Sequence, residues 1–212
     1  MRVILPSTEI LDDINGKEIL QKIERAAKVC YKSESNIRED SAERFVYGLL
    51  NRGHEGPLEH VTLSIKFICD RGVSHELVRH RLASFCQEST RYCNYSIDKF
   101  GKDVTFIKPC YLKEDPENDA WNTWYRSCQF AEAAYFKLLE EGCKPEEARA
   151  VLPNSLKTEV VMTANIREWR HFFKLRAAES TGKVHPQMKE LTVPLLRELQ
   201  CRIPVVFADI IL

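Results

Sequence analysis

The sequence lacks the features that define several common classes of protein. Its 212 residues carry 31 basic and 31 acidic side chains, so no excess of positive charge favours general binding to nucleic acid. No apolar run approaches the roughly 20 residues that a membrane-spanning helix needs. The apolar run before Pro6 is too short for a signal peptide, and the acidic residues that follow it are unusual in a transit peptide. We therefore predict a cytoplasmic protein whose partners include neither nucleic acid nor membrane.

Metal-binding and dinucleotide-binding signatures are also missing. The eight cysteines are scattered without a CxxC pair, so neither a zinc ribbon nor a disulfide framework is expected. The segment 53–60, GHEGPLEH, holds two histidines and two carboxylates, but its Gly-Pro step prevents the helical spacing of an HExxH site. No GxGxxG turn of a Rossmann fold is present. We predict no metal site, and any bound anion has to be held by a local group of arginines.

The pattern of apolar residues predicts a mixed fold. Hydrophobic residues make up 44% of the chain, enough for a globular core. Alternation predicts strands over residues 61–69, 104–108 and 156–164. Steps of three and four predict helices over residues 18–31, 40–53, 74–82, 116–141, 145–153 and 165–179, and one from Pro186 that Pro194 kinks or splits. Residues 83–100 are interpreted as a loop. Without a βαβ rhythm, we predict an α+β fold: a single domain over residues 1–212, with a mixed or antiparallel sheet and several helices.

The densest cationic group is Arg79-His80-Arg81. Guanidinium groups match the geometry of oxyanions, so this group suits a phosphate or another anion. A helical wheel over residues 74–82 places Glu76, Arg79 and His80 on one face. Taken alone, the group is better explained as a solvated basic helix end, which the helix dipole favours.

The residues after this group shift the interpretation toward a binding site. Hydroxyl, amide, carboxylate and guanidinium groups crowd into one aperiodic segment, and a nucleotide's phosphate, sugar and base need such groups. They are Ser84, Gln87, Glu88, Ser89, Thr90, Arg91, Tyr92, Asn94 and Tyr95. An ordinary surface loop with the same composition is the alternative.

Arg176 stands out on the predicted helix after Asn165. Trp169, Phe172 and Phe173 lie within a third of a turn of its direction, and an unpaired buried arginine is costly. Either Arg176 extends to the edge of this aromatic stripe, or the stripe lines a pocket in which a ligand meets the guanidinium. The other side of the helix carries a basic face that is interpreted as solvated surface: Arg167, Arg170, His171 and Lys174.

Several ordered motifs make the chain similar to the flavin-dependent thymidylate synthases. The signature of that family is Arg-His-Arg, seven residues, then Ser, and the chain has RHRLASFCQES at residues 79–89. GHEGPLEH at 53–60 resembles the family's GHxxPxEH segment, and ARAVLP at 148–153 its ARxVLP segment. TANIR at 163–167 and KLRA at 174–177 resemble the C-terminal segments. Residues 53–177 therefore carry the resemblance.

The resemblance implies the reductive methylation of dUMP to dTMP. FAD would carry the hydride, NADPH would be the reductant, and 5,10-methylenetetrahydrofolate would donate the carbon and leave as tetrahydrofolate. It also implies a homotetramer, with subunits assembling so that active sites lie at their interfaces. Arg176 is the implied catalytic residue: it would contact the uracil and favour ionisation at N3, where a cation in a dry setting is most effective.

The resemblance also implies two sets of binding residues. The cofactor-binding set is His54, Gly56, Glu59, Arg79, His80, Arg81, Gln87, Asn165, Arg167 and His171. The dUMP-binding set is Glu76, Arg79, Gln87, Glu88, Ser89, Thr90, Arg91, Arg149 and Arg176. Four positions depart from the common family pattern, namely Glu76, Cys86, Gln87 and His171. Two alternatives stay open: another flavin or nucleotide enzyme with the same arginine group, and a nucleic-acid-binding module, against which the neutral net charge weighs.

Overall fold

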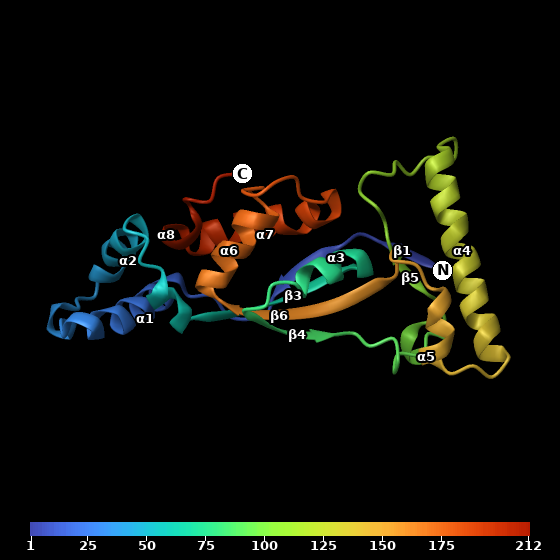
Figure 1. Cartoon of the computed structure of the whole chain (residues 1–212), viewed down its shortest axis with the longest axis horizontal. Coiled ribbons are helices and arrows are strands. Elements are labelled where there is room, and N and C mark those ends of the chain that lie inside the picture. Colours follow the sequence, from blue (N-terminus) through green and yellow to red (C-terminus); the bar gives the residue numbers. More distant parts are fainter. The chain divides into compact units, whose positions relative to one another are not determined.

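The computed structural model describes the backbone of residues 1–212 and every side chain except that of Phe100. Helices and strands follow one another irregularly, which confirms the predicted α+β class (Figure 1). The strands are β1 (Arg2–Ile4), β2 (Ser7–Ile10), β3 (Thr62–Asp70), β4 (Ala83–Gln87), β5 (Thr105–Ile107) and β6 (Lys157–Asn165). The α-helices are α1 (Gly16–Lys28), α2 (Ser41–Asn51), α3 (Arg71–Leu77), α4 (Asp119–Glu140), α5 (Pro145–Ala148), α6 (Ile166–Arg176), α7 (Pro186–Arg202) and α8 (Pro204–Phe207).

The contacts within the chain group its residues into two compact units, each assembled from separate segments. Unit 1 consists of Met1–Ser7, Phe67–Arg79 and Phe85–Val161. Unit 2 consists of Thr8–Lys66, His80–Ser84 and Met162–Leu212. The prediction of a single domain over residues 1–212 stays a prediction.

The strands form two sheets, and both parallel and antiparallel backbone pairing occur in the chain. β1 pairs in parallel with β5, with Val3 opposite Phe106. Phe106 also forms an isolated antiparallel bridge with Leu156. The larger sheet has the strand order β2-β3-β6-β4. Neighbours in this order are far apart in sequence, so its pairing depends on long-range contacts that periodicity alone does not reveal.

Most of the predicted elements are present, and two predictions were wrong. The helix predicted over residues 74–82 is α3, which starts earlier because Asp70 Oδ1 accepts a hydrogen bond from the Val73 amide at 2.7 Å. It ends at Leu77, so Arg79 and His80 do not lie on a helical face. The predicted loop over residues 83–100 contains β4, whose alternation was concealed because Cys86 is exposed and Gln87 is half-buried. The last long helix, α7, runs through Pro194 without splitting.

Each unit has its own apolar core. In unit 1 the core includes Tyr95, Val104, Phe106 and Tyr135, and α4 supplies one side of it. In unit 2 the aromatic residues of α6 are fully buried, and the rings of Phe173 and Phe207 lie 5.9 Å apart, edge to face. The indole of Trp169 on the same helix donates a hydrogen bond to the carbonyl of Leu63 at 3.0 Å. This burial fixes the orientation of α6 within unit 2.

A glycine allows one close backbone approach in unit 2. Gly16 begins α1, and a Cβ added there would lie 2.6 Å from the carbonyl oxygen of Arg202, the last residue of α7. Real Cβ atoms do not come this close to backbone oxygens. The end of α7 can therefore pack against the start of α1 only because residue 16 has no side chain.

We predict that Gly16→Ala destabilises the protein, because the backbone of α7 has to move away from the new methyl group. The free energy of unfolding should fall by about 1–3 kcal/mol, as for other overpacked sites. Chemical denaturation measures this. Gly48→Ala is the matched control: it lies inside α2, its Cβ would meet only the flexible end of Arg52 at 3.5 Å, and it should gain about 0.5–1 kcal/mol. Equal stability of the two variants would contradict the close approach.

Candidate active site

The structure divides the two predicted sets of binding residues between the units. Unit 2 holds the predicted cofactor-binding residues other than Arg79 and Gln87. Unit 1 holds the predicted dUMP-binding residues other than Arg176. The two groups are described separately below, unit 2 first.

His80, the central residue of the Arg-His-Arg motif, is buried against α6 in unit 2. Its Nδ1 lies 3.2 Å from Oε1 of Glu168, and its Nε2 accepts a hydrogen bond from Nε of Arg176 at 3.2 Å. The ring of Phe172 packs edge-on against the imidazole, with 4.9 Å between centroids. Two of the predicted motifs, 96 residues apart in sequence, thus meet at this imidazole.

The surroundings of His80 keep its imidazole neutral. Burial, the positive charge of Arg176 and the proximity of His171 together lower the pKa of His80 to about 4, with burial the largest cause. Burial also raises the pKa of Glu168, partly offset by His171. A neutral imidazole can accept one hydrogen bond and donate another, which a protonated one cannot.

Arg176 ends α6 and is half-buried. The aromatic stripe predicted around it does exist, but Trp169, Phe172 and Phe173 are fully buried in the core of unit 2. Arg176 therefore extends from the edge of a dry aromatic core, with its Nε held by His80. The structure thus matches the alternative in which Arg176 extends to the edge of the aromatic stripe, and not the one in which the stripe lines a pocket.

The segment before β3 contacts the first turns of α6. Glu59 pairs with Arg167 at 2.6 Å, and both side chains are about half exposed. His54, Gly56, Arg81 and His171 are exposed as well. Unit 2 therefore presents imidazole and guanidinium donors to solvent.

Asn165, predicted to bind the cofactor, has a structural task in the chain. It is the N-cap of α6, and its Oδ1 accepts a hydrogen bond from the amide of Glu168 at 2.9 Å. Its amide NH2 group is not used by this bond and could still donate to a ligand.

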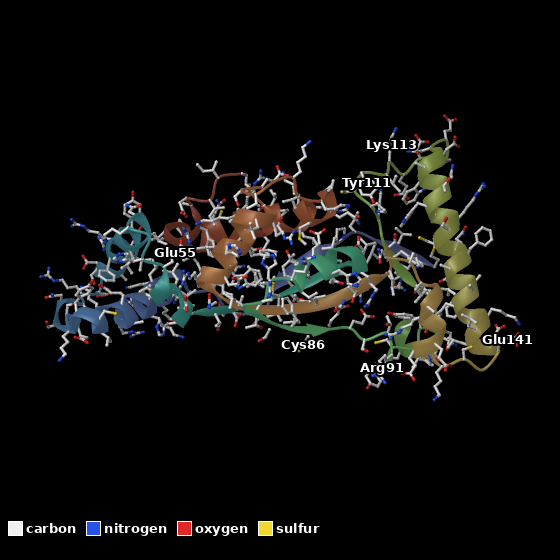
Figure 2. All side chains as sticks on the ribbon, in the orientation of Figure 1. Glu55, Cys86, Arg91, Tyr111, Lys113 and Glu141 are labelled. Atoms are coloured by element: carbon white, nitrogen blue, oxygen red, sulfur yellow. The ribbon has the colours of Figure 1, made fainter. Side chains whose placement is uncertain are left out.

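The basic face predicted for α6 is not uniformly solvated, and for Arg170 that interpretation was wrong. Arg170 is 2% exposed. Its guanidinium forms a two-pronged pair with Asp209, with both N–O distances 2.7 Å, and bonds to Glu55 at 3.1 Å and to the carbonyl of Val206. Glu55 is labelled in Figure 2. Sequence spacing could not identify these partners, because Asp209 is 39 residues away.

In unit 1, residues that follow β4 meet the segment after α5. Arg149 donates a hydrogen bond to Oγ1 of the buried Thr90 at 3.0 Å. Arg91, labelled in Figure 2, pairs with Glu146 at 3.0 Å. The Ser89 hydroxyl accepts a hydrogen bond from the Arg91 amide at 3.3 Å. Two arginines and two hydroxyls, predicted from separate motifs, are thus brought together.

Glu88 and Gln87 point into a polar network in unit 1. Glu88 accepts hydrogen bonds from the Tyr95 hydroxyl and from Lys157, both at 3.0 Å. Burial lowers the pKa of Lys157, but its bonds with Glu159 and Glu88 raise it more, so the lysine stays charged. Glu88, Tyr95, Lys157 and Glu159 line a cavity of about 530 Å³.

Gln87 donates to the buried hydroxyls of Ser74 and Thr158, at 3.0 and 3.2 Å. Sequence reasoning missed Ser74, Lys157, Thr158 and Glu159 as neighbours of the predicted site. For Lys157, Thr158 and Glu159 the available signal was a run of three polar residues at the start of the predicted strand, and for Ser74 there was none.

The arginines on either side of His80 in sequence are exposed. Within the described part of the chain, neither Arg79 nor Arg81 is paired with a carboxylate. Glu76, near the end of α3, is half-buried. Among the described side chains, no group of three or more histidine, cysteine, aspartate or glutamate residues is arranged to hold a metal ion. None of the helices that the structure describes is long and apolar enough to cross a membrane.

Known proteins with similar sequences agree on one family, and a solved structure shares the fold. The family model described as thymidylate synthase complementing protein matches residues 10–205. A flavin-dependent thymidylate synthase of Pyrococcus furiosus is 33% identical over 193 residues, which cover 88% of this chain and 76% of that protein. Another, of Corynebacterium glutamicum, is 33% identical over 214 residues, covering 93% and 81%. A solved structure of a UMP/dUMP methylase of Streptomyces cacaoi, bound with 5-Br dUMP, has a TM-score of 0.78 at 22% identity, covering 98% and 96%.

The fold and the motifs thus define an α+β enzyme of nucleotide metabolism. The chain belongs to the flavin-dependent thymidylate synthase family. The predictions of this family and of an enzyme are confirmed, and the solved structure supports the fold.

The buried Arg170 pair predicts a dependence of stability on pH. The hydrogen bond from Arg170 lowers the pKa of Asp209 below its usual value, although burial of Asp209 opposes this shift. Because the folded pKa lies below the unfolded one, this stabilisation is complete above the unfolded pKa and is lost as pH falls through the folded pKa. Denaturation curves at about pH 6 and about pH 3 should show wild type losing more stability than Asp209→Asn. Equal losses of unfolding free energy in wild type and Asp209→Asn between the two pH values would contradict the prediction.

Proposed function

We propose that this chain catalyses the reductive methylation of dUMP to dTMP. FAD is the hydride carrier, NADPH the reductant, and 5,10-methylenetetrahydrofolate the carbon donor that leaves as tetrahydrofolate. The observation that carries the proposal is the contact between Arg176 and His80, because it joins two motifs of the family at one place in unit 2. The family match over residues 10–205 spans both motifs.

The donors of unit 2 fit a flavin dinucleotide. Its pyrophosphate needs cationic hydrogen-bond donors, and Arg81 is exposed with no carboxylate partner among the described residues. Arg167, His54 and His171 add further exposed donors. When bound, the flavin supplies the hydride that completes the new methyl group. We assign to it His54, Gly56, Glu59, Arg79, His80, Arg81, Gln87, Asn165, Arg167 and His171.

The polar groups of unit 1 suit the phosphate and sugar of dUMP. Arg149 and Arg91 supply guanidinium groups beside the hydroxyls of Thr90 and Ser89. Arg91 and Arg149 are largely exposed, so each retains N–H groups that can face a phosphate. The proposed dUMP-binding residues are Glu76, Arg79, Gln87, Glu88, Ser89, Thr90, Arg91, Arg149 and Arg176.

Arg176 would act on the uracil and not merely hold it. Its guanidinium projects from a dry aromatic core, where a positive charge stabilises a developing negative charge more than it does in water. Beside the uracil it would favour loss of the N3 proton, which makes C5 nucleophilic. The neutral state of His80 matters here, because a protonated imidazole would repel the guanidinium that it contacts.

We also propose the assembly and setting that the resemblance implies. Residues 1–212 would act as one catalytic domain, and four copies would form a homotetramer with active sites at the subunit interfaces. The proposed location is the cytoplasm.

An assay of dUMP methylation tests the function directly. The purified protein should carry FAD without a covalent bond, show a visible flavin spectrum that changes on addition of dUMP, and form dTMP when NADPH and methylenetetrahydrofolate are present. A flavoprotein that leaves dUMP unchanged would favour another flavin or nucleotide enzyme. A colourless protein that takes up no FAD but binds single-stranded DNA in a salt-dependent way would favour a nucleic-acid-binding module.

We predict that Arg176→Ala lowers the methylation rate by about 100-fold or more at saturating dUMP, as expected when a transition-state electrostatic contact is removed. Arg176→Lys should recover little, because an ammonium lacks the planar fork of the guanidinium. Reduction of bound flavin by NADPH should survive, since that step needs no ionised uracil. Steady-state kinetics and stopped-flow absorbance measure the two steps. A normal rate at saturating dUMP would show that Arg176 serves binding alone.

A further inference from the structure

Glu168 is a buried carboxylate outside the motifs that identify the family. It lies in the first turn of α6 and is 5% exposed. A carboxylate in a first helical turn is favoured by the helix dipole, but burial costs more than this gain unless the charge has a partner. Its Oε1 faces Nδ1 of His80 at 3.2 Å.

The contacts on the two sides of His80 determine where its proton lies. A guanidinium has donors only, so Nε2 of His80 has to accept the hydrogen bond from Arg176 Nε. A neutral imidazole that accepts at Nε2 carries its hydrogen on Nδ1, and that hydrogen points at the Glu168 carboxylate. The three side chains therefore form one directed chain of donors, Arg176 to His80 to Glu168.

We propose that Glu168 is a positioning residue for the methylation reaction. Its carboxylate holds His80 in the Nδ1–H tautomer and fixes the ring, and the Nε2 lone pair in turn orients the guanidinium of Arg176. The inference rests on the proposed function of Arg176. Without Glu168 the ring can rotate or change tautomer, and an Nε2–H would face the Arg176 donors instead of accepting from them.

The tautomer itself can be measured without any catalytic assay. In wild-type protein with ¹⁵N-labelled histidine, NMR should show a pyrrole-type Nδ1 and a pyridine-type Nε2 for His80, assigned by the loss of these signals in His80→Gln. An Nε2–H tautomer, or a protonated ring at neutral pH, would overturn the proposal. This readout also separates it from the proposed function, since the NMR result stands even if dUMP is not methylated.

Two substitutions at position 168 distinguish a role in positioning His80 from an effect of the negative charge alone. Glu168→Gln keeps an oxygen acceptor at the same reach, so kcat should stay within about threefold of wild type. Glu168→Asp keeps the charge but withdraws the acceptor by one methylene, so kcat should fall by about 10-fold or more, as when the partner that orients an imidazole is lost. The KM for dUMP should change less than kcat, and the FAD content should be retained.

Glu24→Asp is the matched control, because Glu24 is likewise fully buried in unit 2, where it accepts hydrogen bonds from Ser41 at 2.8 Å. It should cost stability and leave kcat unchanged. The opposite order, with Glu168→Gln slow and Glu168→Asp normal, would show that only the charge matters and would overturn the proposal. Equal losses of kcat in Glu168→Asp and Glu24→Asp would overturn it as well.

Discussion

Helix α6 carries two buried charged side chains, and the arrangement of unit 2 depends on the groups that hydrogen-bond to them. Its aromatic side packs into the core, which brings Glu168 and Arg170 out of water on neighbouring parts of the helix. A buried charge without a partner costs several kcal/mol, so each needs a fixed counterpart. Arg170 finds Glu55 and Asp209, and Glu168 finds His80.

These two solutions have different consequences. The Arg170 group joins α6 to the segment before β3 and to the residues after α8, so it holds segments of unit 2 together. The Glu168 contact acts on a single ring, and through that ring on Arg176. One buried charge therefore supports the fold, whereas the other supports the side chain on which the proposed chemistry depends. A helix with a fully apolar buried face would provide neither.

Unit 1 differs from unit 2 in that its polar side chains stay available for ligand binding beside an apolar core. Thr90 is buried but its hydroxyl is held by Arg149, and Glu88 is held by Lys157 and Tyr95. These bonds compensate for lost contact with water and leave the exposed guanidinium groups of Arg91 and Arg149 oriented by their neighbours. A guanidinium group that is already oriented can bind a phosphate with little further loss of side-chain conformational freedom.

The sequence alone determined the family and many of the elements, because both depend on local information. Apolar periodicity marked most helices and the strands β3, β5 and β6, and ordered motifs such as Arg79-His80-Arg81 pointed to flavin-dependent thymidylate synthases. Local pattern could not show that α3 ends at Leu77, that β4 lies in the presumed loop, or that Arg170 is buried. Those features are decided by pairing between distant segments, as is the chain of donors from Arg176 through His80 to Glu168. Only the tertiary structure sets which side chains lose contact with water, and that loss makes a partner necessary.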